Sequence, residues 1–484
     1  MSSNARASGM PSSSAGKEVG DIVQTPDAPI KSWRYLGGGK WEPNDAVRFT
    51  ATSPGGEVEI SPVGDVKNPL AQTAAWSPPS AQLMPMPVPT MIDTCQSGWS
   101  NHTGTGTVTI DTTDGYAGQN SVKITCGANT TSSTIAKKIL AAPIDMTGKQ
   151  LGIVLKFPAG SLAKISELRV VLLDLAGTNF FSWVPIRGTN QAPKVRDGRW
   201  DKLHLSFAGA VLTGTDPRAA IQQIRVTAIP YASEEPPVAS VGVAYGFPKS
   251  PRFPNGVVSL TFDDGYAESP EFAKRMAAYG YRGTGNIIPE QLNDAAGNFM
   301  TTSVCRSLKS VWGWELAQHG DIYWGADVTD IAKWRAYMAQ KRAEMIALGA
   351  GAGCNVFAYP GGQQDYDVQD AVSLLNAVGR TIDQGSSNTF PIPECLPPGN
   401  WLSTWAMSSI SSAAGATPIA TVTGAITKAK AEGAWLILVF HHGTSGVPAN
   451  SLYCNYTDFD TILASIAASG MDCLPMGEVA TSPF

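Results

Sequence analysis

The sequence predicts a multidomain protein in which an N-terminal β-sandwich precedes an α/β domain built on a largely parallel sheet. Between about residues 92 and 246, short β-branched segments follow one another with turn residues between them and no long helical pattern. From about residue 257 onward, strand-like segments alternate with helical ones, which is typical of β/α units in a sheet that is open or closed into a barrel. The length of 484 residues also exceeds that of one ordinary domain.

Residues 1–90 form a leader that fits neither pattern. The segment is rich in Ser at first and later in Pro, especially over 84–89, and this composition favours extended, non-helical chain. Trp33, Tyr35 and Trp41 interrupt the low complexity. We therefore expect an irregular leader that is either disordered or an attachment region.

Residues 91–247 are predicted to form the sandwich. The arrangement resembles the jelly-roll sandwiches of carbohydrate-binding modules, including the aromatic Trp200 just before a strand, and a structural spacer is the alternative. His204 alternates with the apolar residues Leu203 and Leu205, so we expect it on the surface. The segments with strand character are 107–110, 121–125, 152–157, 168–173, 202–207, 223–227 and 238–243.

A Pro-punctuated linker at 247–256 leads into the α/β domain, which we expect over residues 255–484. Asp327 or Thr329 is available as the N-cap of its longest helix. The predicted strands are 257–262, 355–359, 435–440 and 471–474, and the predicted helices lie near 268–279, 328–348, 367–378, 418–432 and 458–469.

The composition argues against several classes of function. A net charge of −5 gives no basic surface for nucleic acid, and no apolar run reaches the ~20 residues that a membrane-spanning helix needs. The N-terminus lacks the apolar segment of a secretory signal. The seven cysteines show no CxxC spacing, which argues against a cysteine-based metal site, although Cys95 and Cys126 could pair within the sandwich.

The strongest chemical signal is the segment 257–266, where an apolar strand ends in Asp263 and Asp264 followed by Gly265. Strand ends followed by loops are where α/β enzymes place reactive groups. One carboxylate can bind a cation while the other, left free, accepts a proton. A turn that caps the following helix is the alternative for such a motif.

Three further segments, at 314–323, 356–362 and 438–443, contain three of the five histidines of the chain. Together with the Thr-Phe-Asp-Asp-Gly motif they resemble, in order and spacing, the polysaccharide deacetylase family (carbohydrate esterase family 4, the NodB-homology domain). The resemblance covers roughly residues 255–484 and implies a distorted (β/α) barrel. It also implies hydrolysis of acetyl groups on a polysaccharide.

The chemistry of such a reaction requires an activated water, a base, an oxyanion stabiliser and an acid for the leaving group. A divalent metal lowers the pKa of a bound water toward ~7 and polarises the carbonyl group. Carboxylate and imidazole ligands suit zinc or a similar ion, with one position left open. Asp264 and His319 are the available ligands of these types.

By position, the resemblance implies a role for each of these residues. Asp263 is expected to be the general base, Asp264 a metal ligand and His319 the first histidine ligand. His441, directly after an apolar strand, is expected to be the general acid, with His442 as the alternative.

Substrate contacts are also implied. The loop of Tyr359 and Pro360 corresponds to a groove wall that can donate a backbone N–H to the oxyanion. Tyr359, Trp314 and Trp324 are candidate sugar-stacking surfaces, with core packing as the alternative for the two tryptophans, and His442 is a further candidate contact.

Two positions depart from the pattern of the family. Its second motif has histidines at i and i+4, but the fourth residue after His319 is Tyr323, so the third ligand is expected to be Tyr323, Asp321 in a different loop geometry, or water. Many members carry an arginine that orients the base where this chain has Ala358. Asp263 would therefore need another partner.

The sequence thus predicts a metal-dependent hydrolase, with Zn²⁺ as the expected metal, that removes N- or O-linked acetyl groups from a bacterial surface or capsular polysaccharide. The alternative is a deacetylase fold that has lost catalysis and only binds glycan. Because an enzyme for surface glycan without an export signal fits a phage tail spike, we expect an extracellular or virion-associated protein. Such spikes are commonly trimers, attached here through residues 1–90.

Overall fold

The computed structural model describes residues 83–84, 87–187, 195–382 and 393–482, and the backbone of three short strands near the N-terminus. Those strands, β1 (Ile22–Gln24), β2 (Ser32–Gly37) and β3 (Lys40–Pro43), pair antiparallel in the order β1-β2-β3. The prediction of irregular chain is wrong for them, because two aromatic-containing segments flank a Gly-Gly pair, which is a hairpin signal. The attachment role expected for 1–90 otherwise falls mostly outside the described residues.

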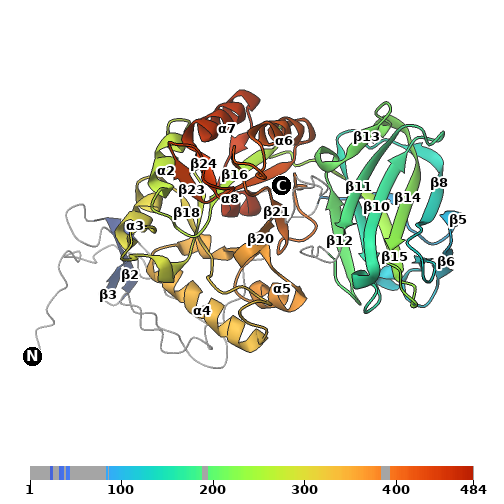
Figure 1. Cartoon of the computed structure of the whole chain (residues 1–484), viewed down its shortest axis with the longest axis horizontal. Coiled ribbons are helices and arrows are strands. Elements are labelled where there is room, and N and C mark those ends of the chain that lie inside the picture. Colours follow the sequence, from blue (N-terminus) through green and yellow to red (C-terminus); the bar gives the residue numbers. More distant parts are fainter. Residues whose placement is uncertain are drawn as a thin grey trace, which may run out of the picture.

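Two antiparallel sheets form a β-sandwich (Figure 1). Its strands are β4 (Thr90–Asp93), β5 (Trp99–Gly104), β6 (Thr107–Asp111), β7 (Ser121–Thr125), β8 (Thr134–Ile144), β9 (Lys149–Lys156), β10 (Ile165–Leu173), β11 (Phe180–Arg187), β12 (Trp200–Leu205), β13 (Val211–Thr213), β14 (Ile221–Pro230) and β15 (Val238–Pro248). One sheet has the order β13-β11-β10-β14-β8-β5, and the other β12-β9-β15-β7-β6, with β4 beside β15. Leu168 and Val226 of the first sheet share one core with Leu155 and Val241 of the second.

All seven segments predicted as strands in this region are strands in the structure. The prediction missed β4, β5, β8, β11 and β13. β5 and β13 are almost entirely exposed, so their polar or isolated side chains do not alternate as those of a half-buried strand do.

A parallel sheet forms the centre of the second domain. Its strands are β16 (Val257–Phe262), β17 (Thr284–Ile287), β18 (Glu315–Gln318), β19 (Val356–Ala358), β20 (Val378–Ile382), β21 (Thr404–Ala406), β22 (Trp435–Phe440) and β25 (Asp472–Cys473). The order is β21-β20-β19-β18-β17-β16-β22, and β25 pairs with the first residues of β16. Met407, just after β21, forms a parallel bridge with Leu438 of β22, so the sheet closes into an irregular barrel.

Helices surround this barrel (Figure 1). They are α2 (Ser269–Ala277), α3 (Thr302–Ser310), α4 (Ile331–Ala347), α5 (Tyr366–Ser373), α6 (Ile419–Glu432), α7 (Tyr456–Ser469) and α8 (Met476–Thr481). The N-cap of α4 is Asp330, whose side chain accepts hydrogen bonds from the N–H groups of Ala332 and Lys333, and neither Asp327 nor Thr329 has this role. None of the described helices is long and apolar enough to cross a membrane.

The two domains contact each other directly, and this contact changes the environment of His204. The residue is only 4% exposed, so the prediction of a surface histidine is wrong. Its Nδ1 lies 2.8 Å from the carbonyl oxygen of Pro397 and its Nε2 lies 2.9 Å from the hydroxyl of Tyr245. His204 does face away from the sandwich core, but the barrel domain covers that face.

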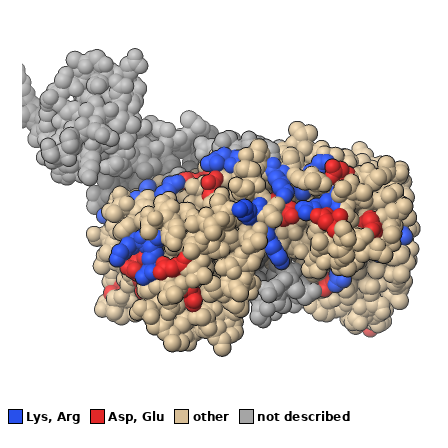
Figure 2. Space-filling model, turned by 90° about the horizontal axis from the view of Figure 1, so that it is seen from above, with Lys and Arg blue, Asp and Glu red and all other residues tan. Residues whose placement is uncertain are grey.

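The seven cysteines are all free thiols, so the suggested pairing of Cys95 with Cys126 is wrong. Both side chains are buried in the sandwich core. On the face that Figure 2 shows, acidic and basic side chains are interspersed among a large majority of uncharged residues.

Candidate active site

The carboxyl end of β16 places Asp263 and Asp264 at one end of the barrel. All six residues of β16 are buried, and the N–H of Asp263 continues the pairing by donating to the carbonyl oxygen of Phe440 at 2.9 Å. Asp264 then adopts a φ of +70°, a left-handed conformation that aspartate tolerates better than most residues. The chain therefore turns sharply at the point where the strand ends.

Asp263 is 4% exposed and is held by side chains from two other strands, the neighbouring β17 and the more distant β20. Nη2 of Arg380 on β20 lies 2.7 and 2.6 Å from its two carboxylate oxygens, and Nδ2 of Asn286 on β17 donates to Oδ1 at 2.8 Å. Burial alone raises the pKa of this carboxyl, but the charges of Arg380, His319 and His441 and the hydrogen bond of Asn286 lower it to about 2. Asp263 is therefore ionised at neutral pH and fixed in orientation.

Arg380 is the functional residue that the sequence reasoning missed. Its Cα pairs in register with that of Ala358 on the parallel neighbour β19, the position where the family resemblance led us to expect an arginine. The guanidinium thus comes from the adjacent strand. The signal in the sequence is an arginine inside the short run 378–382, which directly follows the helix predicted near 367–378 and is not among the predicted strands.

His319 follows β18 and meets Asp264. Its Nε2 lies 3.2 Å from Oδ1 of Asp264, and its Nδ1 lies 2.8 Å from the carbonyl oxygen of Ala358. The carbonyl can only accept, so Nδ1 carries a proton and Nε2 is directed at the carboxylate. Burial lowers the pKa of His319, but the hydrogen bond to Asp264 and the two aspartate charges outweigh it and raise the pKa.

Asp264 and His319 together fit two positions of a divalent cation site. Among the described residues, no group of three His, Cys, Asp or Glu side chains is close enough to hold a metal. The carboxylate of Asp321 instead accepts a hydrogen bond from Nε2 of Gln291 at 2.7 Å. A third ligand of these types is thus absent from the described part of the chain.

Tyr323 lies close to the aspartate pair and is 41% exposed. Burial raises the pKa of its phenol, and the charges of Asp264 and Asp321 raise it further. Its ring packs on Gly361, where an added Cβ would lie 2.7 Å from Cε1. Its role as third ligand remains a prediction.

The two adjacent histidines after β22 have different environments. Nε2 of His441 lies 3.9 Å from Oδ2 of Asp263, and burial is the main cause that lowers its pKa. The ring of His442 instead lies between those of Tyr266 and Tyr453, with centroid distances of 3.6 and 4.4 Å. Of the pair, His441 is the one that faces the aspartates.

His442 has a carboxylate partner of its own. Its Nδ1 lies 3.4 Å from Oε1 of Glu268. The stacked rings and this partner fix its orientation. It therefore lies beside the candidate site as part of an aromatic stack.

Two of the expected sugar-stacking residues are in the core, and those predictions are wrong. Trp314 is 1% exposed and stacks on Phe262 with a centroid distance of 4.5 Å. Tyr359 is equally buried and its hydroxyl donates to the carbonyl oxygen of Leu402 at 2.8 Å. Trp324 is partly exposed, and its indole N–H donates to Asp365.

The expected oxyanion donor in the Tyr359–Pro360 loop is also not available from these two residues. The N–H of Tyr359 donates to the carbonyl oxygen of Arg380 at 3.0 Å within the sheet. Pro360 is buried and has no N–H. The strand pairing of β19 with β20 thus uses the donor that the sequence had suggested for the substrate.

Comparison with solved structures gives matches for each domain separately. A family 4 acetyl xylan esterase from Clostridium thermocellum, in complex with cobalt, is 16% identical, with 46% of this chain and 89% of that chain covered and a TM-score of 0.32. A peptidoglycan N-acetylglucosamine deacetylase is 14% identical, with coverages of 48% and 90% and a TM-score of 0.31. A family 11 carbohydrate-binding module from Clostridium thermocellum is 14% identical, with coverages of 33% and 95% and a TM-score of 0.25.

No family model and no curated protein sequence matches this chain. The identities and TM-scores of the solved structures are too low to assign the chain to a family. The functional argument therefore depends on the geometry of the site itself.

Proposed function

We propose that this protein is a metal-dependent hydrolase that removes acetyl groups, N- or O-linked, from a polysaccharide. The observation that carries the proposal is that two adjacent aspartates have different partners. Asp264 meets an imidazole at 3.2 Å, whereas Asp263 is bound by Arg380 and Asn286 and leaves the cation site free. A hydrolase that uses one aspartate as a metal ligand and the other as a general base requires such a difference.

Asp263 is the proposed base. Because its pKa is held near 2, it is ionised at neutral pH but is a weak base, so it needs a water that is already acidified. A divalent metal, with Zn²⁺ as our first choice, would supply that acidity and polarise the acetyl carbonyl when bound. Asp264 and His319 would hold the metal, and Tyr323 or a water molecule would be the third ligand.

His441 is the proposed acid. It follows β22, which lies on one side of β16, whereas β17 and β18, which His319 follows, lie on the other side, and its Nε2 is 3.9 Å from Oδ2 of Asp263. A protonated imidazole at this place can donate to the nitrogen or oxygen of the departing sugar. His319, with Nδ1 fixed by the carbonyl of Ala358, keeps Nε2 directed toward Asp264.

The test uses an acetylated glycan panel and the full chain. Asp263→Asn should retain bound metal and lose acetate release by at least about 100-fold, whereas His319→Ala should lose both. Arg282→Ala, far from these residues in an exposed ion pair with Glu478, is the matched control. Wild-type rates of acetate release in both site variants would refute the proposal.

The alternative is a glycan-binding protein without catalysis, and one observation favours it, namely the missing third His, Cys, Asp or Glu ligand in the described chain. It predicts retention on acetylated glycan with no acetate release at any metal concentration. Release of new reducing ends without a metal requirement would instead indicate a glycoside hydrolase.

A further inference from the structure

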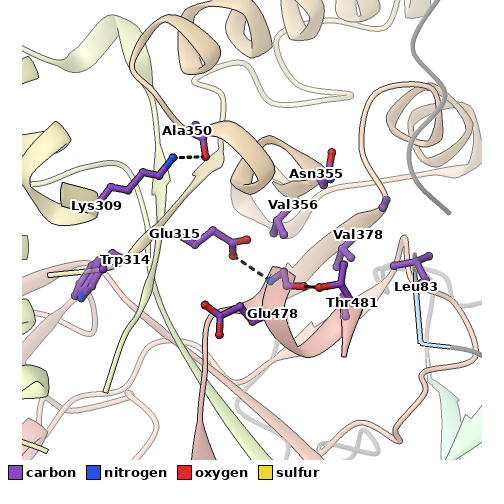
Figure 3. Close-up of a pocket in the computed structure, with 14 residues that line it drawn as sticks. Leu83, Lys309, Trp314, Glu315, Ala350, Asn355, Val356, Val378, Glu478 and Thr481 are labelled. Atoms are coloured by element: carbon purple, nitrogen blue, oxygen red, sulfur yellow. Dashed lines mark hydrogen bonds between the residues drawn. The ribbon is translucent and has the colours of Figure 1, made fainter. Parts of the chain in front are cut away.

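A cavity of about 440 Å³ lies at the end of the barrel opposite the candidate active site (Figure 3). Its lining includes Glu315, Val356 and Val378, the first residues of β18, β19 and β20, whereas His319 follows the last residue of β18. The four residue-to-residue steps from Glu315 to His319 span about 13 Å of extended chain. The cavity is therefore separate from the aspartate pair, and its volume is typical of a small-molecule site.

The walls of this cavity are mostly aliphatic. Leu83, Ala377 and Ala480 join the two valines, and α8 covers one side with Gly477 and Thr481. Figure 3 shows the Glu315 side chain extending between these walls, with one carboxylate oxygen directed at the backbone of α8. Of the two acidic residues in the lining, Glu315 and Glu478, only Glu478 is paired with an arginine, Arg282.

Glu315 has no cationic partner among the described residues. Its Oε2 accepts hydrogen bonds from the hydroxyl of Thr284 and the N–H of Gly477, both at 3.1 Å, and neither donor is charged. Burial raises the pKa of the carboxyl to about 7, which is the expected response of an acid without a counter-ion.

The other titratable groups around the cavity are already engaged or neutral. Nζ of Lys309 on α3 donates to the carbonyl oxygens of Gly349 and Ala350, the second of which is marked in Figure 3. Its charge is the smallest of the influences on the pKa of Glu315, and burial is the largest. Glu478 of α8 pairs with Arg282. The nearby thiol of Cys354 stays protonated, because burial raises its pKa to about 11.

We infer that this cavity binds a primary ammonium group carried on an aliphatic chain, with Glu315 as its counter-ion. The aliphatic walls accommodate the chain, and the carboxylate receives the charge. A guanidinium fits less well, because its planar fork needs both carboxylate oxygens and Oε2 already has two donors. One free oxygen suits the compact charge of an ammonium.

The ligand chemistry has two sources, a free alkylamine or a lysine side chain of a protein. The probes are therefore n-pentylammonium, Nα-acetyl-lysine N-methylamide and the neutral 1-pentanol, titrated by ligand-observed NMR at pH 8, where the ammonium is still charged. We expect n-pentylammonium to bind at least about tenfold more tightly than 1-pentanol. Equal binding of the lysine derivative indicates a protein lysine as the source, and its exclusion indicates a free amine.

Glu315→Gln should weaken n-pentylammonium by about tenfold or more. Glu478→Gln changes a carboxylate of the same cavity that is already paired, and should leave the affinity within about twofold. Binding in wild type should also weaken from pH 8 to pH 6, as Glu315 becomes protonated. The same probe, n-pentylammonium, is used in all three comparisons.

Retained far-UV circular dichroism checks that Glu315→Gln is folded. If it is not, Thr481→Trp at the exposed edge of the cavity serves instead, because it narrows the cavity without altering the carboxylate, and it should also lower the affinity. Equal affinity of wild type and Glu315→Gln would overturn the inference. So would the absence of any binding to wild type at about tens of millimolar of n-pentylammonium, a concentration well above the Kd of a ~1 mM site.

Discussion

Arg380 holds Asp263 through a single nitrogen, Nη2, which lies within 2.7 Å of both carboxylate oxygens. Arg380 is fully buried and Asp263 nearly so. Because Arg380 pairs in register with Ala358, the charge partner of the proposed base comes from the strand next to the one where the sequence suggested it.

The first prediction concerns this ion pair. Arg380→Ala should destabilise the fold by about 3–5 kcal/mol, because it leaves a buried carboxylate without a partner. Urea unfolding measures the change. Arg282→Ala, which removes an exposed pair with Glu478, should cost less than about 1 kcal/mol.

The register of the two strands suggests a rescue. In the Arg380→Ala background, Ala358→Arg returns a guanidinium at the neighbouring position, and we expect it to recover part of the lost stability. A double variant no more stable than Arg380→Ala would show that the two strand positions are not interchangeable.

The second prediction separates the candidate third ligands. Tyr323→Phe should weaken metal binding by about tenfold, since a ligand is removed while the ring that packs on Gly361 is kept. Asp321→Asn should change it little, because that carboxylate is directed at Gln291. Competition with a chelator measures both affinities, and the reverse order would assign the ligand to Asp321.

The third prediction separates the adjacent histidines. His441→Ala should lower kcat for acetate release by about 100-fold, because the proposed proton donor is lost. His442→Ala should alter stability more than kcat, since its ring is stacked between two tyrosines. Steady-state kinetics and thermal unfolding of both variants give the comparison, and equal losses of kcat would contradict it.

The fourth prediction concerns pH and Glu315. Its pKa is raised to about 7 in the folded protein, against about 4.3 when unfolded, so folding favours the protonated form. Its contribution to stability is therefore fully present below about pH 4.3 and is lost as the pH rises through 7.

Glu315→Gln removes this titration. Between pH 5 and pH 7 the unfolding free energy of wild type should fall by about 2 kcal/mol relative to that of Glu315→Gln. Urea unfolding at a series of pH values measures the difference. Parallel pH profiles would show that Glu315 does not titrate in this range.

The fifth prediction concerns Trp314 and Trp324, which were both candidate sugar-stacking residues. Trp314→Ala should destabilise the protein by about 3–5 kcal/mol, because a buried ring stacked on Phe262 is lost. Trp324→Ala, at a partly exposed position, should instead raise KM for a polymeric substrate with a smaller effect on stability. A large effect of Trp314→Ala on KM alone would contradict its assignment to the core.

Some features of the fold and site were predictable from local pattern. The run that ends in Asp263 and Asp264 is a buried strand, and parallel strands bring their carboxyl ends to one place, so His319 and His441 meet the aspartate pair. The helices α6 and α7 lie within a few residues of the predicted ranges 418–432 and 458–469, whereas α3 and α8 were not predicted.

The features that the sequence alone did not reveal depend on contacts between distant segments. His204 faces away from the sandwich core, as the alternation of apolar and polar residues predicts. The alternation does not show whether water or another domain covers that face. Trp314 and Trp324 have the same side chain, but only Trp314 stacks on Phe262 and lies in the core.

Local patterns in the sequence indicate which chemical groups lie at the strand ends, because period and composition act over a few residues. The partner of each group depends on how distant segments pack together. Strand register places Arg380 beside Ala358 and its guanidinium on Asp263, and it gives the N–H of Tyr359 to the sheet. Such pairings arise from free energies of burial and hydrogen bonding between residues in different strands, and Asp263 and Arg380 are 117 positions apart, so no local pattern contains them.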